Sequence, residues 1–390
     1  MDVSRSLGEQ TFRAGTEYEL VVFDRLAPQE QILLAELRED AGFYGILRPR
    51  DGSGRTMRSV DRDTALLWLS TQSPGRLPFF VWEGVDHAVA TRRVTQLVLD
   101  GVLEIELEGS FVSGARALPV FGPGESTRTA GRLNHLADEA LRYGETLHLD
   151  DADELAARLY SYGTVPLSPT WTRRLTGSDE VLDFLGASPG TSLHRDLASL
   201  FTHTPAQEDG AWMSWSKASR RTPRATDPVY KLYVSPQPED FPRTFRELVQ
   251  VLAVQDHLQF KVGASALGVL RPDKAVVYFE NVEMLQRAAD LLATRLASVA
   301  PQGVPFSAEI AGDGLLSWGM DPPRNARVLS WHDYDSWRLW VVRRLARAIV
   351  TAQSEPHGGA DASRYAVERL RLDGVDVDAW TPSNATWWLA

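Results

Sequence analysis

The chain has 390 residues, enough for two or three domains, and carries a net charge of −11 at pH 7. It contains no cysteine, which excludes a thiolate nucleophile, an iron–sulfur cluster and a cysteine-based zinc site. The acidic balance argues against a broad nucleic-acid-binding surface. No apolar run approaches the ~18 residues that span a bilayer, and the N-terminus lacks the apolar core of a signal peptide. We therefore expect a cytoplasmic protein with neither nucleic acid nor a membrane among its partners.

Residues 1–120 predict a small winged-helix-like module. One strand and three helices come first, over Glu17–Phe23, from Pro28, over Asp61–Leu69 and over Asp86–Leu99. Apolar residues then alternate with glutamates from Leu103 to Glu108, and Gly109 follows, which predicts a hairpin. Helices followed by a hairpin are typical of a winged helix.

The charge of this module decides among its possible partners. It holds 13 arginines, no lysine and 19 acidic residues up to Glu125, and three glutamates line one face of the predicted wing. DNA phosphates would be repelled there. A peptide added along the edge of the wing is therefore favoured over DNA, and a packing or dimerisation role is the structural alternative.

Residues 121–226 are expected to be a linker followed by a helical region. Residues 121–135 are rich in Gly, Ser and Thr, and short helices are expected over Asp179–Leu185 and His194–Leu200. The polar stretch Thr204–Thr226 contains the basic run SKASRRTPR. It could be a lid over a site or an irregular loop.

Residues 227–352 alternate strands with helices and predict an α+β domain, a sheet with helices packed on one side. Strands are expected over Val229–Val234, Leu258–Gly263, Ala275–Glu280, Val304–Ile310 and Gly314–Met320. Asn281 is expected to cap one helix, and Asp335 a longer helix that runs to Val350. Residues 353–390 are expected to be a tail packed on this domain.

Lysine use points to this domain as the site of chemistry. Only four of the 41 basic residues are lysines, at positions Lys217, Lys231, Lys261 and Lys274. Arginine serves for the remaining basic positions, and lysine differs from arginine in being able to lose its proton when its pKa is lowered. The retained lysines are therefore candidates for a role that arginine cannot fill.

Strand alternation brings these lysines together. Lys231 shares a strand face with Tyr233, and Lys274 shares one with Tyr278, while Lys261 points away from its apolar neighbours. If these strands are neighbours, three lysines and two tyrosines converge on one surface. A solvated open sheet face is the structural alternative.

Such a cluster suits β-elimination of phosphate. Nearby ammonium groups repel one another, which lowers the pKa of at least one lysine and makes it a general base. The other cations, with Arg271 in a bidentate fork, would hold the phosphate. The eight histidines form no HxH or HExxH pattern, so we expect no metal and no cofactor.

Three motifs resemble the type III effector HopA family, which is related in fold to the phosphothreonine lyases of bacterial pathogens. They are KLYVSP at Lys231–Pro236, FKVG at Phe260–Gly263 and RPDKAVVYF at Arg271–Phe279, and the resemblance covers roughly Leu159–Val350. Similar domains act in bacterial pathways to lanthipeptides and thioamitides. There, a kinase phosphorylates Ser or Thr of a precursor peptide, and the lyase eliminates phosphate to give dehydroalanine or dehydrobutyrine.

The resemblance implies roles residue by residue. Lys261 matches the general base, and Lys231 and Arg271 match phosphate-binding residues. Tyr278 matches a tyrosine of the pocket. The further phosphate-binding arginine would be Arg338, with Arg324 as the second candidate; Lys274, kept as a phosphate- or substrate-binding candidate, has no counterpart in the pathogen lyases.

The general acid is where the chain departs from the pathogen lyases. They read Lys-Phe-His, and the histidine is the acid, whereas Tyr233 stands at that position here. Tyrosine has a pKa near 10, so it could donate a proton but is a different acid. Three possibilities stay open: the general acid is Tyr233, it is another residue, or the reaction uses no general acid.

The resemblance also implies partners. The N-terminal module resembles the winged-helix elements that bind the leader of a precursor peptide. The expected partners are a phosphorylated precursor peptide, leader and core, and a cognate Ser/Thr kinase, with a cyclase as a further candidate. Two alternatives stay open: a non-catalytic phosphopeptide-binding subunit that partners the kinase, and a winged-helix regulator that senses a phosphorylated ligand.

Overall fold

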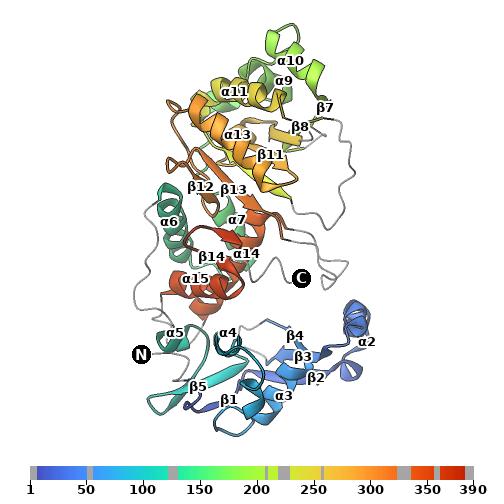
Figure 1. Cartoon of the computed structure of the whole chain (residues 1–390), viewed down its shortest axis with the longest axis vertical. Helices are drawn as coiled ribbons and strands as arrows, with labels where there is room; N and C mark the ends of the chain where they lie inside the picture. Colours follow the sequence, from blue (N-terminus) through green and yellow to red (C-terminus); the bar gives the residue numbers. More distant parts are fainter. Residues whose placement is uncertain are drawn as a thin grey trace.

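A computed structural model describes residues 7–50, 56–121, 131–206, 210–217, 229–255, 259–322, 335–354 and 361–382. These segments combine helices with sheets, in keeping with the predicted α+β class. In Figure 1 the N-terminal module (blue to cyan) lies at one end of the long axis and the largest sheet towards the other, with helices α14 and α15 between them. No helix in the described segments is both long enough and apolar enough to cross a membrane.

The N-terminal module contains two three-stranded sheets. One has the order β1-β5-β6, and its strands are β1 (Phe12–Ala14), β5 (Leu103–Leu107) and β6 (Ser110–Val112). The other has the order β2-β3-β4, and its strands are β2 (Tyr18–Val22), β3 (Phe43–Pro49) and β4 (Arg58–Asp61). The helices are α2 (Pro28–Leu33), α3 (Arg62–Ser70), α4 (His87–Leu99) and α5 (Leu118–Phe121).

The predicted helices and hairpin of this module are confirmed. Asp61 and Asp86 cap α3 and α4 by accepting hydrogen bonds from backbone N–H groups of the first turn. Glu108 and Gly109 both have positive φ, as the tight turn between β5 and β6 requires. The sequence reading missed β1, β3 and β4, so the module has a second sheet that a simple helix–helix–hairpin plan lacks.

The middle of the chain is helical and then joins the main sheet. Its elements are α6 (Arg132–Thr146), α7 (Ala152–Tyr160), α8 (Pro169–Arg174), α9 (Ser178–Phe184), α10 (Ser192–Leu200), β7 (Thr202–Thr204) and β8 (Trp212–Ser216). The irregular loop predicted from Thr204 is wrong over β8, which alternates buried and half-buried side chains as a strand does. Most of the predicted linker and of the basic run lies outside the described residues.

The main sheet has seven antiparallel strands in the order β12-β13-β9-β11-β10-β8-β7. Its remaining strands are β9 (Tyr230–Val234), β10 (Gln259–Gly263), β11 (Ala275–Phe279), β12 (Ala308–Ile310) and β13 (Leu316–Met320). The predicted neighbourhood of the lysine-bearing strands is confirmed, because β11 lies between β9 and β10. Strand β12 begins later than predicted, since Phe306 has a φ of 63° and interrupts the extended backbone.

Helices cover the apolar face of this sheet (Figure 1). They are α11 (Phe241–Ala253) and α13 (Val282–Arg295), and the short α12 (Ala266–Leu270) follows β10. Phe245 and Leu248 of α11 are fully buried, as are Leu232 and Val277 of the sheet. Helices α11 and α13 thus occupy one side, but the prediction that all helices pack there is wrong: Trp337, at the start of α14, packs against Gly319, the strand partner of Lys231, on the opposite face.

The last elements connect the sheet to the N-terminal module. They are α14 (Trp337–Ser354), α15 (Ala362–Leu372), β14 (Val375–Asp376) and β15 (Thr381–Pro382). Tyr365 of α15 donates a hydrogen bond to the carbonyl of Leu99 in α4, 2.7 Å away, and Arg369 pairs with Asp100. The described part of the tail therefore packs on both halves of the molecule, while the final residues lie outside the described range.

Candidate active site

The register of the three central strands places the predicted residues on one face. Tyr278 is the direct partner of Lys231, and Val276 is the partner of both Tyr233 and Lys261. Side chains of directly paired residues project to the same side of a sheet. Lys231, Tyr233, Lys261 and Tyr278 therefore share the face opposite to α11 and α13.

Lys261 lies among aromatic rings rather than carboxylates. Its Nζ is 4.2 Å from the ring centre of Trp212 and 5.7 Å from that of Tyr278. Within the described residues, no oxygen atom accepts a hydrogen bond from it. Burial, and then the charge of Lys231, lower the pKa of Lys261 to about 8. A substantial share of its amine is thus neutral near physiological pH, as a general base requires.

Lys231 is held by an aspartate that the sequence reading missed. Its Nζ is 2.6 Å from Oδ2 of Asp321, and it lies 5.4 Å from the ring centre of Tyr278. The second oxygen of Asp321 accepts a hydrogen bond from the backbone N–H of Trp337, at the start of α14. Asp321 therefore links the lysine to a helix N-terminus, where a carboxylate is favoured.

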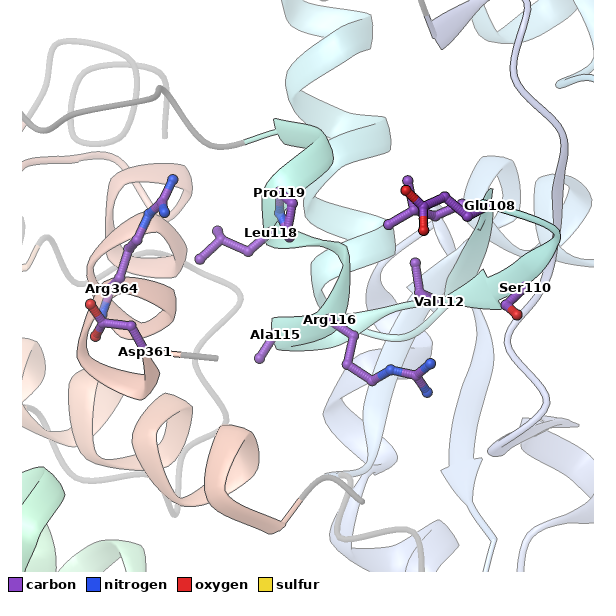
Figure 2. A pocket seen from close by; sticks show the side chains of 10 residues that line it. Glu108, Ser110, Val112, Ala115, Arg116, Leu118, Pro119, Asp361 and Arg364 are labelled. Carbon is purple, nitrogen blue, oxygen red and sulfur yellow. The ribbon is translucent and has the colours of Figure 1, made fainter. Parts of the chain in front are cut away.

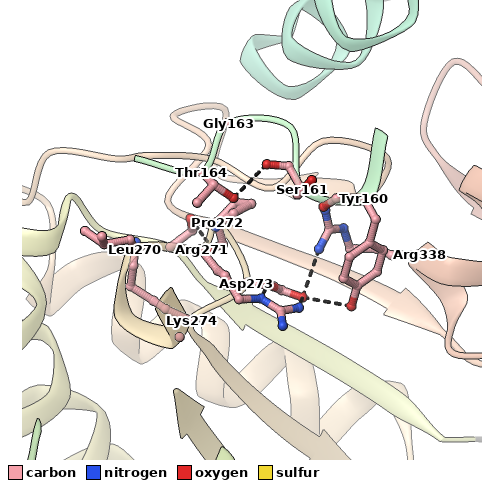
Figure 3. Close-up of polar contacts among 12 residues, drawn as sticks. Tyr160, Ser161, Gly163, Thr164, Leu270, Arg271, Pro272, Asp273, Lys274 and Arg338 are labelled. Carbon is pink, nitrogen blue, oxygen red and sulfur yellow. Dashed lines mark hydrogen bonds and ion pairs between the residues drawn. The ribbon is translucent and has the colours of Figure 1, made fainter. Parts of the chain in front are cut away.

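A second missed aspartate organises the arginines (Figure 3). Both oxygens of Asp273 accept hydrogen bonds from Arg271, at 2.8 and 2.9 Å. Oδ2 also accepts a hydrogen bond from the Tyr160 hydroxyl at 3.0 Å and lies 2.9 Å from Nη1 of Arg338. Burial alone would raise the pKa of Asp273, but Arg338 and Arg271 outweigh it and lower this pKa to about 2.

Arg338 occupies a supporting position. It is fully buried, and besides the ion pair it donates hydrogen bonds to the carbonyls of Tyr160 and Pro305. Its Nη1 makes no well-aligned hydrogen bond to Asp273, so the contact is an ion pair by distance. With no exposed surface, Arg338 does not contact a ligand directly in this arrangement, which differs from the predicted phosphate contact. The alternative candidate, Arg324, lies outside the described residues.

Trp212 joins the two halves of the site. Its ring centre is 4.9 Å from the guanidinium carbon of Arg271, as well as 4.2 Å from Nζ of Lys261. The indole therefore lies between a cation of the phosphate-binding group and the candidate base. Sequence reading missed it because β8 was assigned to a loop, although the alternation of Trp212–Ser216 could have revealed a strand.

The tyrosines stay protonated. Burial, and then the charge of Asp321, raise the pKa of Tyr233 well above its ordinary value, and the same two causes raise the pKa of Tyr278. Among the described residues the Tyr233 hydroxyl makes no hydrogen bond. Its hydroxyl is consequently a neutral donor that no described residue uses.

Lys274 is placed differently from the prediction. It is fully buried, and its Nζ donates to the carbonyl of Pro236, 2.6 Å away, and to Oε1 of Gln302. The amide of Gln302 in turn donates to the carbonyls of Gly163 and Leu270. Burial lowers the pKa of Lys274 to about 7. Its hydrogen bonds join loops at the end of the sheet, and Figure 3 shows it directed away from Arg271 and Asp273.

The site as a whole carries an excess of positive charge. Four cations, Lys231, Lys261, Arg271 and Arg338, face the two carboxylates of Asp273 and Asp321. The excess is therefore two charges when Lys261 is protonated and one when it is neutral. A phosphate monoester dianion equals the excess when Lys261 is protonated, and it is still attracted by the excess of one charge that remains when Lys261 is neutral.

Comparisons with known proteins give only distant likenesses. No protein-family model and no curated protein matches the chain. An effector protein from Pseudomonas syringae pv. tomato strain DC3000 aligns with 65% of this chain and 99% of its own, at 12% identity and a TM-score of 0.38. The phosphothreonine lyase SpvC, an effector from Salmonella, aligns with 48% of this chain and 89% of its own, at 13% identity and a TM-score of 0.27. Likenesses this low do not establish a function for the chain.

Proposed function

We propose that this chain is a carbon–oxygen lyase that eliminates phosphate from phosphoserine or phosphothreonine of a ribosomally made precursor peptide, giving dehydroalanine or dehydrobutyrine. The observation that carries the proposal is Lys261. It is a half-buried lysine of lowered pKa with no acceptor among the described residues, on a face where other cations are in excess. A structural lysine would be expected to have a carboxylate or carbonyl partner, as Lys231 and Lys274 do.

The elimination uses these residues in separate roles. The neutral amine of Lys261 removes the Cα proton, the electron pair forms the Cα–Cβ double bond, and the Cβ–O bond breaks. Tyr233 donates a proton to the departing oxygen, so that the product leaves as hydrogen phosphate. Lys231 and Arg271 bind the phosphate oxygens and stabilise the charge that develops on them.

The supporting residues hold Arg271 in place. Asp273 receives both of its hydrogen bonds, and Arg338 and Tyr160 hold Asp273 from the other side. A guanidinium fixed in this way loses little side-chain entropy when phosphate binds. Arg338 would thus act on phosphate through Asp273.

The N-terminal module would bind the leader of the precursor. Strand β6 is an edge of its sheet, so an extended peptide can pair with it. A cavity of about 630 Å³ lies beside this edge and is lined by apolar Leu107, Val112 and Leu118 together with charged residues of the wing and of α15 (Figure 2). Because the proposed reaction removes phosphate and cannot add it, a separate kinase must supply the substrate.

A purified-protein assay tests the reaction. A phosphothreonine peptide is incubated with the chain, with and without the leader, and is followed by mass spectrometry. We expect loss of the mass of phosphoric acid with the unaltered chain, faster with the leader attached, and none with Lys261→Ala. Absence of elimination from the leader-bearing phosphopeptide would contradict the proposal.

The alternative, a phosphopeptide-binding subunit that partners a kinase, draws on the same cations but needs no base. Lys261→Arg separates the two functions, because it keeps the charge and removes the base. We expect this variant to retain phosphopeptide binding, measured by calorimetry, and to lose elimination. If the unaltered chain binds the phosphopeptide and leaves it intact, the binding function is the one supported.

A further inference from the structure

A second group of arginines lies far from the lysines. It lines a cleft of about 310 Å³ between the N-terminal module and the helices α14 and α15. The charged residues that line it are Arg58, Arg344, Arg347, Arg369, Asp100 and Asp373. Four arginines against two aspartates leave an excess of two positive charges, in a chain whose net charge is −11.

The aspartates do not use up the arginine donors. Arg58 and Arg369 share one oxygen of Asp100, at 2.8 and 2.5 Å. Nε of Arg58 and Nη1 of Arg369 are buried and have no hydrogen-bond acceptor within the described structure. Buried guanidinium donors without acceptors are costly, so these atoms call for an acceptor in addition to those that the described residues supply.

Like-charge repulsion is also present in the cleft. Burial lowers the pKa of Arg344, and although Asp373 opposes this, the neighbouring Arg347 and Arg369 lower it further. Arg347 is exposed on α14 and makes no ion pair with any described residue. An anion entering the cleft would relieve this repulsion and meet Arg347 at its mouth.

This cleft is separate from the candidate active site. Arg338 and Arg347 are nine residues apart on α14, which places them about 13 Å apart along the helix and on roughly opposite sides of it. Arg338 faces Asp273, whereas Arg347 faces the N-terminal module. One phosphate group therefore cannot occupy both places.

We infer that the cleft between the N-terminal module and helices α14 and α15 is a second binding site for a phosphate group. Arg347 captures the group at the mouth of the cleft, and Arg58 and Arg369, which line the cleft, attract it by their charge. The group is either free phosphate or a phosphorylated side chain of a peptide. The inference is independent of the proposed lyase activity, because it uses none of the residues of the candidate active site.

The test uses the full chain with the candidate active site disabled by Lys261→Ala and Arg271→Ala. Binding of inorganic phosphate is measured by calorimetry at constant ionic strength. Adding Arg347→Ala should weaken binding by roughly tenfold or more, because a charge-assisted hydrogen bond is lost. Arg347→Lys should weaken it less, and Arg287→Ala, which removes an exposed arginine of α13, should leave it unchanged.

A second titration distinguishes the two sources of phosphate. Tighter binding of a phosphothreonine peptide than of inorganic phosphate, again lost with Arg347→Ala, would assign the cleft to a phosphorylated chain. Equal binding would assign it to free phosphate. Phosphate binding that is absent in the disabled chain, or equally strong with and without Arg347→Ala, would overturn the inference.

Discussion

At the scale of single residues, Lys231 and Lys261 differ in their proposed roles because only Lys231 has a carboxylate as its direct partner. Lys231 has Asp321 2.6 Å away, whereas the Nζ of Lys261 lies near the rings of Trp212 and Tyr278 and forms no ion pair with any described carboxylate. Both carry the same side chain on the same sheet face. The partner that the fold supplies therefore separates the phosphate-binding cation from the candidate base.

This difference predicts the pH dependence of elimination. The pKa of Lys261 is about 8, so the neutral amine accumulates as pH rises through that value. The rate constant kcat/KM for a phosphopeptide should rise with pH to about 8 and then level. Lys231→Met removes the neighbouring charge that lowers this pKa and should move the inflection to higher pH, although burial keeps it below the ordinary lysine value. An inflection that stays in place would contradict the assignment of the base to Lys261.

The contacts of Asp273 predict that its replacement lowers both the stability of the fold and the affinity for the phosphopeptide. Asp273→Asn leaves the buried Arg338 without its counter-ion, and breaking a buried ion pair costs about 3–5 kcal/mol. It also releases Arg271 from its two hydrogen bonds. We expect urea unfolding at a clearly lower midpoint and, under conditions where the variant is folded, a larger rise in KM than fall in kcat. A variant with unchanged unfolding would refute this account of the network.

The aspartates were beyond what the sequence could predict, and the reason is physical. Lys231 and Asp321 are brought together by strand pairing between β9 and β13, and Asp273 meets Arg338 only when α14 docks. Local periodicity carries no information about such distant pairs. It does specify which residues share a strand face, so the convergence of Lys231, Lys261 and Tyr278 could be predicted.

At the scale of elements, the sequence predicts the central strands of the main sheet correctly, whereas it predicts neither β8 nor the N-terminal strands β1, β3 and β4. The strands that bear Lys231, Lys261 and Tyr278 have strongly apolar alternate positions and were predicted correctly. Strand β8 reads WMSWS between polar segments, and those polar flanks predict a loop. Its strand character depends on pairing with β10, a tertiary effect that outweighs local composition.

The junction of β10 with α12 predicts a packing-sensitive position beside the site. A Cβ at Gly263 would lie 2.3 Å from the backbone carbon of Gly268, so Gly263→Ala must push the strand and the helix apart. Because α12 leads directly into Arg271, the same shift displaces the phosphate-binding arginine. We expect destabilisation of about 1–3 kcal/mol in thermal unfolding and weaker phosphopeptide binding.

Gly75→Ala is the matched control for this change. A Cβ at Gly75 would meet no atom within 4 Å, and its backbone conformation is open to other residues. Its unfolding temperature and binding should stay close to those of the unaltered chain. Equal effects at the two glycines would show that the close approach at Gly263 is not what limits this position.

At the scale of the whole molecule, the halves are joined by both apolar and ionic contacts. One continuous set of buried residues runs from the N-terminal module through the main sheet to the last helix, with Phe12, Phe245 and Tyr365 among its members. Helix α14 lies at the centre of this arrangement (Figure 1). Its first turn supports the candidate active site, and its later turns face the cleft beside the module.

The position of Asp100 at the junction leads to a prediction about how the stability of the N-terminal module depends on its contact with α15. Its carboxylate forms ion pairs with Arg58 of the module and with Arg369 of α15, and its side chain is only 6% exposed. Asp100→Ala leaves Arg369 buried without its nearest counter-ion, so the loss should reach about 3–5 kcal/mol of unfolding free energy. Because the pair spans the junction, we expect the module to unfold before the main sheet, as two transitions in calorimetry instead of one.

Asp63→Ala, which removes an exposed aspartate from the same module, should preserve the transition of the unaltered chain. A single transition at an unchanged temperature in Asp100→Ala would mean that the apolar contacts alone hold the halves together.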